Sequence, residues 1–438
     1  MNILLVSAYE MGRQPFGIAS PAAWLTREGH YVTCADLAIQ PLADEQIRDA
    51  DLIAFHLPMH TATRLARPVI GRVKQTNPGA RLACYGLYAP INADLLRSLG
   101  ADAVIGGEFE SGLLQFVHGQ TPPEVSLARQ KFLTPLRKPL PDLDRYAKLS
   151  YKGESYRVAY TEASRGCKHL CRHCPVVPVY QGKFRVVDRE VVLQDIRQQI
   201  AAGASHVTFG DPDFFNGPKH AMAIVTALHA EFPEVSYDAT IKIEHLLKHR
   251  DLLQPLKETG CLFVTSAAES VDDDVLAKLE KHHTRSDFLK AAGWMREAGL
   301  VLSPTFIPFT PWTTLNGYRD LLEVIADLDL VDHVASVQLA LRLLVTSGSS
   351  LLELEDLRAS LGPFDFEALV YPWRHPQVEM DRLADRVFHL VHACQTRSES
   401  RAQVFEKLWQ AAYDAPLPHN YRLRPRATIP YLDEPWYC

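Results

Sequence analysis

Residues 167–174 read Cys-Lys-His-Leu-Cys-Arg-His-Cys and place three thiols, Cys167, Cys171 and Cys174, on one short stretch of chain. Thiolates hold iron–sulfur clusters, and three at this spacing can bind three irons of a four-iron cubane. No fourth Cys follows nearby to bind the remaining iron. The stretch therefore predicts a [4Fe-4S] cluster with one open iron, where a substrate or cofactor can bind and be reduced.

Zinc is the main alternative, since His169 or His173 could complete a Cys3His site. However, each His lies within two positions of a Cys, which is tighter than most zinc knuckles, and no second Cys pair follows at ribbon spacing. A disulfide framework is disfavoured because eight cysteines in 438 residues are sparse. The apolar residues 1–6 are too short for a signal core and lack a basic start. We expect reduced thiols and a cytoplasmic protein.

The cysteine stretch, with residues 162–166 before it and Pro175 after it, resembles the cluster loop of radical S-adenosylmethionine (SAM) enzymes. In that family the open iron binds the amino and carboxylate groups of SAM, and one electron cleaves SAM to a 5′-deoxyadenosyl radical. An aromatic residue usually precedes the third Cys, where this chain has His173. The resemblance implies three metal ligands, two cofactors (the [4Fe-4S] cluster and SAM), and an electron donor such as flavodoxin or ferredoxin.

The first 121 residues alternate short apolar runs with amphipathic stretches. Strands that alternate with helices at these lengths indicate a parallel sheet covered on both faces. We expect an α/β, doubly wound, Rossmann-like domain over residues 1–121. Its strands are expected at residues 2–7, 31–35, 51–55, 81–85 and 103–105, and its helices at 20–28, 45–49, 68–74, 90–98 and 110–117.

Ligands of such sheets bind beyond the carboxyl ends of the strands. Gly86, Gly106 and Gly107 lie at such ends and permit close backbone approach to a large ligand. A simple turn at Gly106-Gly107 is the alternative. The chain has no G-x-G-x-x-G after its first strand, which disfavours a dinucleotide.

A doubly wound domain directly before a radical SAM core resembles the cobalamin-binding domain of cobalamin-dependent radical SAM enzymes. Residues 106–110 are similar to the glycine and acidic run that closes that domain. Cobalamin is therefore implied as a further cofactor. The cofactor contacts implied here are Gly86, Gly106, Gly107 and Glu108.

The family variant with an axial histidine carries the pattern D-x-H-x-x-G, which this chain lacks. The resemblance therefore implies a cobalt without a protein His below it. His56 and His60 are expected to be pocket or surface residues.

Residues 122–155 are predicted to be a linker, because their first twenty are rich in Pro and Lys/Arg without hydrophobic periodicity. Six alternations of strand and helix follow in residues 156–345. They predict a partial (β/α)6 TIM barrel, the radical SAM core, whose reactive groups gather at the carboxyl ends of the strands. The expected strands are residues 157–163, 206–209, 236–241, 262–265, 301–307 and 334–339.

Two polar segments follow strands of this barrel. Gly210, Asp211 and Asp213 come after the second strand, and this segment resembles the one that binds the methionine amino group of SAM; ordinary turn chemistry is the alternative. Ser266 and Glu269 come after the fourth strand and resemble the segment whose carboxylate accepts hydrogen bonds from the ribose hydroxyls. We expect all five residues to contact SAM.

Other candidates rest on position in the sequence. Lys242 and Arg285 are cationic candidates for the methionine carboxylate of SAM. Phe309 and Trp312 follow the fifth strand, where they could stack on adenine or pack in the core.

Residues 346–438 are expected to be mostly helical, with helices at 381–394 and 399–413, and then irregular. The end at Cys438 resembles that of radical proteins with a CUAEP or CCAEP tail. This implies a catalytic redox role for Cys438 and a chain that continues past it through a selenocysteine codon. A surface Cys is the alternative.

Composition narrows the classes of partner. The net charge of −6 disfavours nucleic acid, which requires a concentrated basic face. The apolar stretches fall short of a membrane span. We expect an enzyme that methylates an unactivated carbon of a small-molecule or peptide substrate. The alternatives are a radical SAM rearrangement without cobalamin turnover, and a non-catalytic redox or sensor module.

Overall fold

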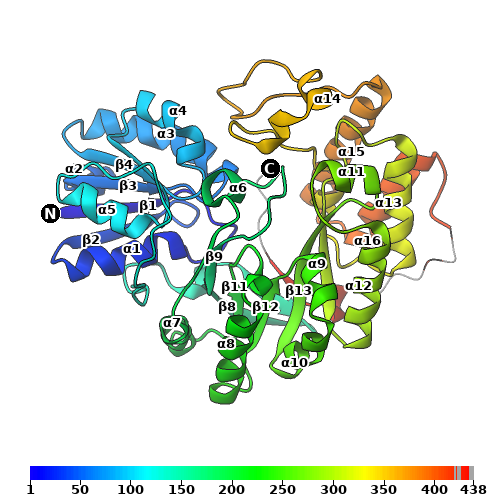
Figure 1. Cartoon of the computed structure of the whole chain (residues 1–438), viewed down its shortest axis with the longest axis horizontal. Coiled ribbons are helices and arrows are strands. Elements are labelled where there is room, and N and C mark those ends of the chain that lie inside the picture. Colours follow the sequence, from blue (N-terminus) through cyan, green and yellow to red (C-terminus); the bar gives the residue numbers. More distant parts are fainter. Residues whose placement is uncertain (419–420, 422–425, 434–438) are drawn as a thin grey trace.

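Two mainly parallel sheets organise the chain, which the computed structural model describes at residues 1–418, 421 and 426–433. In Figure 1 the first sheet (blue) and the second (green) lie side by side. Helix α6 (Val176–Tyr180), which follows the cysteine stretch, lies between them. The cysteine stretch is therefore placed where the two sheets meet.

The first sheet has six parallel strands in the order β2-β1-β3-β4-β5-β6. Its strands are β1 (Asn2–Ser7), β2 (Tyr31–Asp36), β3 (Leu52–His56), β4 (Arg81–Tyr85), β5 (Ala103–Gly107) and β6 (Val125–Ser126). Its helices are α1 (Phe16–Arg27), α2 (Asp44–Arg48), α3 (His60–Thr76), α4 (Ala93–Ser98) and α5 (Phe109–Val117).

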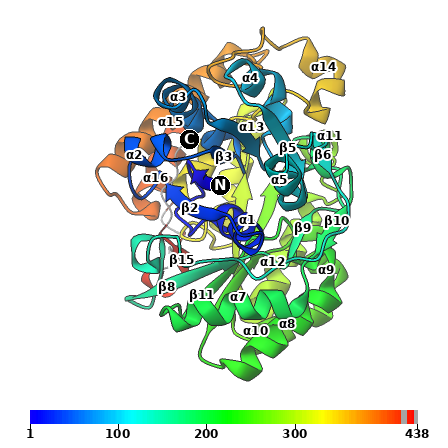
Figure 2. The ribbon, with the colours of Figure 1, turned by 90° about the vertical axis from the view of Figure 1, so that its left-hand side faces the viewer.

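Helices cover both faces of this sheet. Alternate residues of β1 enter different cores, because successive side chains of a strand point to opposite faces. Leu4 packs in the cluster that includes residues of α2, α3 and α4, whereas Leu5 packs in the cluster with α1 and α5. Figure 2 shows α3 and α4 on one side of the sheet and α1 on the other. The doubly wound arrangement is confirmed.

The second sheet has the order β14-β13-β12-β11-β8-β7-β15. Five strands are parallel and curl into a partial barrel, which confirms the expected architecture of the core. They are β8 (Glu154–Thr161), β11 (His206–Phe209), β12 (Ser236–Thr240), β13 (Cys261–Glu269) and β14 (Val301–Phe306). The helices between them are α7 (Arg189–Ala201), α8 (Pro218–Glu231), α9 (Ile243–Lys248), α10 (Leu253–Glu258), α11 (Asp273–Lys278) and α12 (Arg285–Glu297).

The predicted sixth strand at residues 334–339 is wrong, because Ser336–Leu339 form a short 3-10 helix, η5. Side chains from this segment occupy the edge of β14 where a sixth strand would pair. The backbone N–H of Phe306 donates to Oε1 of Gln338 at 3.2 Å, and His333 Nδ1 lies 2.8 Å from the carbonyl oxygen of Leu302. The barrel is therefore open on this side.

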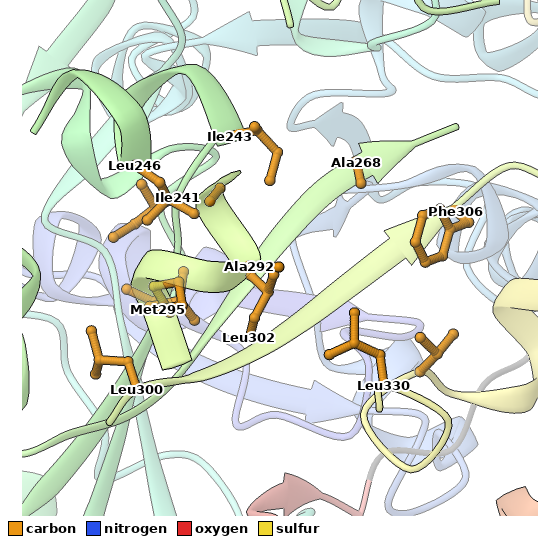
Figure 3. Close-up of a cluster of buried hydrophobic side chains, with 14 of the residues drawn as sticks. Ile241, Ile243, Leu246, Ala268, Ala292, Met295, Leu300, Leu302, Phe306 and Leu330 are labelled. Atoms are coloured by element: carbon orange, nitrogen blue, oxygen red, sulfur yellow. The ribbon is translucent and has the colours of Figure 1, made fainter. Parts of the chain in front are cut away.

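The core of the barrel lies between the sheet and its helices. Figure 3 shows Ala292 and Met295 of α12 close to Leu302 of β14. The rings of Phe288 and Phe306 also meet edge to face, with centroids 5.9 Å apart. This packing fixes β14 and β13, whose carboxyl ends carry part of the site.

The remaining segments join this framework. Residues 122–155 include β6, which pairs with β5, and β7 (Lys148–Tyr151), which pairs antiparallel with β8. Strand β15 (Tyr431–Leu432) then pairs with β7. Beyond α13 (Leu315–Asp327) the described chain combines helices with irregular stretches; its helices are α14 (Glu355–Arg358), α15 (Val378–Thr396) and α16 (Arg401–Tyr413). Within the described ranges, every helix is too short or too polar to cross a membrane.

Candidate cluster and cofactor site

The cysteine stretch leaves the carboxyl end of β8 on a small hairpin. β9 (Ser164–Gly166) pairs antiparallel with β10 (Phe184–Val186), and residues 167–174 and α6 lie between these strands. A Cβ on Gly166, whose φ is +74°, would come within 2.4 Å of the Tyr180 ring. Only glycine therefore fits the turn that delivers Cys167.

Asn216, which the sequence did not single out, holds this turn in place. Its Oδ1 accepts from the backbone N–H of Lys168 at 3.2 Å and from the thiol of Cys167 at 3.8 Å. Its Nδ2 donates to the carbonyl oxygen of Gly166 at 3.4 Å. A fully buried amide thus fixes the backbone around the first cysteine.

Gly210 and Asp211, which follow β11, support the chain that leads into the same turn. A Cβ on Gly210 would lie 2.1 Å from Oη of Tyr160, so the missing side chain accommodates that ring. The carboxylate of Asp211 accepts from the backbone N–H of Ala163 at 2.9 Å and from the hydroxyl of Ser164 at 2.5 Å. Burial raises the pKa of Asp211 to about 7. Both oxygens of Asp211 are occupied in anchoring β9.

Asp213 lies in a different environment, although it is only two residues further on. Its Oδ1 caps the 3-10 helix η3 (Phe214–Asn216). Its Oδ2 lies 2.7 Å from Nδ1 of His245 and 3.5 Å from Nε2 of His169. Burial alone raises the pKa of Asp213, but the two imidazoles outweigh it and lower the pKa to about 2. Asp213 is therefore a buried carboxylate that stays ionised next to the cysteine stretch.

His169 joins the cysteine stretch to this carboxylate and to Glu244, which lies 3.5 Å from its Nδ1. Ligand atoms of Cys167, His169 and Asp213 lie within 4.8 Å of one another. This set could also hold a single metal ion, so the geometry retains a form of the zinc alternative. His173 points elsewhere, towards Glu269.

Glu269 stands at an irregular position of β13. The register with β14 shifts between Ala267 and Glu269, and the φ of Glu269 is +66°. Its Oε1 lies 3.1 Å from Nε2 of His173 and 3.4 Å from Nζ of Lys281. Burial raises the pKa of Glu269, but Lys281 and His173 lower it to about 2. His173, which replaces the usual aromatic residue, thus connects the cysteine stretch to β13.

Positive charge gathers around the ends of β12 and β13. Lys242 and Lys281 are both buried. Burial first, and then these two ammonium groups, lower the pKa of His283 to about 4. Ser266 is fully buried close by in β13, and its Oγ has no hydrogen-bond partner in the described part of the chain. A buried hydroxyl without a protein partner is unusual, and a water or a ligand atom would complete it.

Arg165 connects the cysteine hairpin to the first sheet. Its guanidinium donates to both oxygens of Glu110, at 2.7 and 2.9 Å, and to Glu162 at 2.8 Å. Glu108 lies 3.8 Å from Arg165 and accepts a hydrogen bond from the Tyr180 hydroxyl at 3.2 Å. Burial raises the pKa of Glu108 to about 7. The two glutamates after β5 therefore contact the hairpin that carries the cysteines.

The three glycines singled out in the first sheet serve close packing. A Cβ on Gly86 would lie 2.9 Å from the Leu57 carbonyl oxygen and one on Gly106 2.5 Å from the Pro90 ring. A Cβ on Gly107 would lie 2.2 Å from the Ser126 carbonyl oxygen. Of the three, Gly107 also lines a cavity between the two sheets.

Two cavities adjoin at the meeting of the sheets and share Met11, Tyr160, Gly210 and Pro212 as lining residues. The first, of about 310 Å³, lies inside the barrel. The second, of about 190 Å³, lies between the sheets. The second cavity is lined on one side by the ends of β1, β3, β4 and β5, and on the other by the cysteine hairpin. A ligand there would touch both halves of the molecule.

Several candidates lie away from this place. Arg285 pairs with Asp320 on α13. Phe309 stacks on Tyr318 in the core, and Trp312 donates to Asp356 at 2.9 Å. Cys438 lies outside the described residues.

Residues 161–325 match the family model of the radical SAM superfamily. Together with the three cysteines and the partial barrel, this match defines a radical SAM domain. The match therefore identifies a radical SAM domain within this chain, and a [4Fe-4S] cluster and SAM are the cofactors that such a domain implies.

Among proteins of known activity, the chain is 25% identical over 334 residues to a hopanoid C-3 methylase from Methylococcus capsulatus, covering 71% of this chain and 63% of that protein. It is 29% identical over 171 residues to a tRNA-2-methylthio-N(6)-dimethylallyladenosine synthase from Desulfosudis oleivorans, covering 37% and 36%. The chain thus spans less than two thirds of the length of these two relatives.

Solved structures share the fold over most of the chain. The cobalamin-dependent SAM radical enzyme OxsB, with aqua-cobalamin and SAM bound, has a TM-score of 0.67 at 13% identity, covering 90% of this chain and 66% of that one. The radical SAM methyltransferase TsrM from Kitasatospora setae, with cobalamin and a [4Fe-4S] cluster bound, has a TM-score of 0.59 at 14% identity, covering 75% and 73%. At these identities the likeness shows the shared fold.

Proposed function

We propose that this chain is a cobalamin-dependent radical SAM methyltransferase. In this proposal residues 1–121 bind the corrinoid, 122–155 connect the two parts, 156–345 hold the cluster and SAM, and 346–438 are a C-terminal helical region and tail. The observation that carries the proposal is the cavity shared by the carboxyl ends of the first sheet and the cysteine hairpin. Ligands of parallel sheets bind at the carboxyl ends of the strands, and here the carboxyl ends of the two sheets face the same cavity.

The cysteine hairpin fits a three-cysteine cluster. Cys167, Cys171 and Cys174 are free, and the other described cysteines, Cys34, Cys84, Cys261 and Cys394, are buried in strands or helices elsewhere. The three thiolates would hold three irons. When bound and reduced by a donor such as flavodoxin or ferredoxin, the cluster supplies reductive cleavage of SAM. Gly166 and Asn216 fix the backbone around Cys167.

The charged groups around the hairpin complement the groups of SAM. Asp213, ionised and buried, suits the ammonium of the methionine moiety. Lys242 suits its carboxylate. Glu269 and Ser266 suit the ribose hydroxyls, since a carboxylate accepts and a serine hydroxyl both accepts and donates hydrogen bonds. Asp211 is engaged by Ala163 and Ser164, so we assign it to support of the hairpin.

The cavity between the sheets suits a corrinoid by position, although its volume of about 190 Å³ would hold only part of the corrinoid and the rest would extend out of its open side. Loops after four parallel strands form one wall, and Glu10 and His56 in that wall have buried polar atoms without hydrogen-bond partners among the described residues. When bound there, a corrinoid would supply methyl-transfer chemistry. The protein places the corrinoid beside the cysteine hairpin and limits the access of water.

The barrel cavity suits a small polar substrate. The interior of a closed barrel is normally filled with branched apolar side chains. Here it is hollow and lined by hydroxyl groups from every parallel strand, namely Tyr160, Thr208, Thr240, Thr265, Ser303 and Thr305. Asp238 adds a carboxylate held by Thr208 at 2.6 Å and His206 at 2.9 Å. A volume of about 310 Å³ favours a small molecule over a peptide.

Cleavage and methyl transfer can be tested before the substrate is known. The protein is reconstituted anaerobically with iron, sulfide and cobalamin and incubated with SAM carrying a deuterated methyl group and with a reductant. We expect 5′-deoxyadenosine, and labelled methylcobalamin by mass spectrometry. Cys171→Ala should abolish 5′-deoxyadenosine formation, whereas Cys34→Ala should retain it. A protein that carries zinc or a fully cysteine-ligated cluster, or that leaves SAM intact, contradicts the proposal.

A further inference from the structure

A buried imidazole faces the cavity between the sheets. His56 is the last residue of β3 and is only 5% exposed, yet it lines that cavity. Two glycines leave room for its ring. A Cβ on Gly17 would lie 1.9 Å from Cε1 of His56, and one on Gly86 would lie 3.0 Å from Cδ2. The chain therefore provides a fitted slot for this ring at the carboxyl end of a central strand.

Glu10, from the loop after β1, orients the ring. Its Oε2 lies 3.5 Å from Nδ1 of His56, and Glu10 is also 5% exposed. Neither atom has a hydrogen-bond partner within the described ranges, and both are sealed from solvent. A carboxylate beside Nδ1 favours the tautomer with a proton on Nδ1 and a free electron pair on Nε2. This is the arrangement by which proteins orient a histidine that binds a metal.

Packing alone does not require an imidazole here. The ring centroid lies 5.2 Å from that of Tyr85 and 5.8 Å from that of Phe109, and an apolar ring would make the same contacts. Burial of a carboxylate and an imidazole that are not hydrogen-bonded disfavours folding. A ligand on Nε2 of His56 would give the buried imidazole a role that packing does not supply.

We propose that His56, oriented by Glu10, supplies the axial nitrogen ligand of the corrinoid cobalt. The inference rests on the proposed function, since it requires a corrinoid in this cavity. It replaces the expectation of a cobalt without a protein histidine. The ligand comes from the end of β3 rather than from a D-x-H-x-x-G loop, so the sequence pattern does not reveal it.

His60 provides a matched control four residues further on. Its Nε2 lies 2.7 Å from the carbonyl oxygen of Ala368, and it does not line the cavity between the sheets. A histidine of the same region is thus already engaged by the backbone. His60→Ala should leave the cobalt unaffected.

Electron paramagnetic resonance of the cob(II)alamin form tests the ligand directly. The full-length protein is prepared twice, once with natural histidine and once with ¹⁵N-histidine, and both are loaded with unlabelled cobalamin. We expect each cobalt line to split as a ¹⁴N triplet in the first sample and as a ¹⁵N doublet in the second. The wild-type comparison needs no variant and therefore does not depend on a variant that folds.

Two variants then show which histidine supplies the nitrogen that splits the cobalt lines. His56→Ala should lose the label-dependent splitting, and His60→Ala should keep it. Bound corrinoid whose splitting is unchanged by the ¹⁵N label overturns the inference and leaves the proposed function standing. Splitting that persists in His56→Ala also overturns it. Wild-type protein that retains no corrinoid on gel filtration overturns the proposed function and the inference together.

Discussion

Acidic residues follow the carboxyl ends of the strands in the first sheet (the first rim) and in the barrel (the second rim). They look alike in the sequence but differ in the structure. Glu110, at the first rim, is bound by Arg165, Ser20 and Gln130. Asp213 and Glu269, at the second, contact imidazole or ammonium groups that line the hairpin region. Glu110 is therefore hydrogen-bonded within the fold, whereas Asp213 and Glu269 gather with cationic groups beside the cysteines.

The difference shows that a position after a strand does not by itself define a ligand contact. Glu110 is held by partners that join two halves of the molecule, and its removal should weaken folding. Asp213 and Glu269 keep pKa values near 2 beside a cofactor region, and their removal should weaken binding. SAM-binding measurements can therefore separate the two rims.

Arg165→Ala should give the largest effect, at the first rim. The change leaves Glu110 buried without its guanidinium partner, which costs about 3–5 kcal/mol of the free energy of unfolding. Denaturant unfolding of the anaerobic protein measures this. Arg157→Ala, which breaks an exposed pair with Asp144, should cost no more than about 1 kcal/mol. Equal losses in the two variants would mean that Arg165 does not join the two parts as described.

Asp213→Asn should weaken SAM binding as well as folding, since the lowered pKa of the carboxylate shows that its ionised form stabilises the folded state. The amide keeps the cap of η3 but removes the charge, and a hydrogen bond to a charged group contributes about 1.5–3 kcal/mol. The Kd for SAM should therefore rise by about 10- to 100-fold. Asp188→Asn, which retains the cap of α7, should leave the Kd unchanged. Calorimetric titration measures both, and an unchanged Kd in Asp213→Asn excludes contact with SAM.

Asp211 should differ from Asp213 in its pH dependence. Burial raises the pKa of Asp211 to about 7 in the folded state, so the folded protein binds a proton more tightly than the unfolded chain. Its contribution to stability is complete below the unfolded pKa of about 4 and is lost as the pH rises to about 7. Asp211→Asn should therefore flatten the decline in unfolding free energy between pH 5 and pH 7 (roughly the interval set by those two pKa values). Parallel slopes for the variant and the wild type would contradict this.

The sequence predicted the elements that depend on local pattern. Cluster ligation requires cysteines at short spacing, and apolar runs such as Asn2–Ser7 and His206–Phe209 mark strands within a residue or two. The segment at residues 334–339 also has a strand-like composition. There the side chain of Gln338, by accepting from Phe306, replaces the strand pairing that composition favours.

The sequence did not reveal contacts between distant segments. Arg165 and Glu110 are 55 residues apart, and His173 and Glu269 are 96 apart. Their partners depend on how the two sheets pack, which no spacing rule records. Asn216 was missed for the same reason, since its role is defined by what surrounds it in three dimensions. His56 was expected to be a pocket or surface residue, and it lines the cavity between the sheets.

Two buried serines are expected to give the smallest effects on stability, and they differ in whether the hydroxyl has a partner. Ser20 donates to Glu110 at 2.6 Å, so Ser20→Ala should cost about 1 kcal/mol of unfolding free energy. Ser266 is equally buried, but its Oγ has no partner in the described part of the chain, so Ser266→Ala should leave the protein as stable or slightly more stable. If Ser266 contacts SAM, its loss should raise the Kd for SAM several-fold while Ser20→Ala leaves the Kd unchanged. Loss of stability without loss of affinity in Ser266→Ala would instead assign its hydroxyl to the fold.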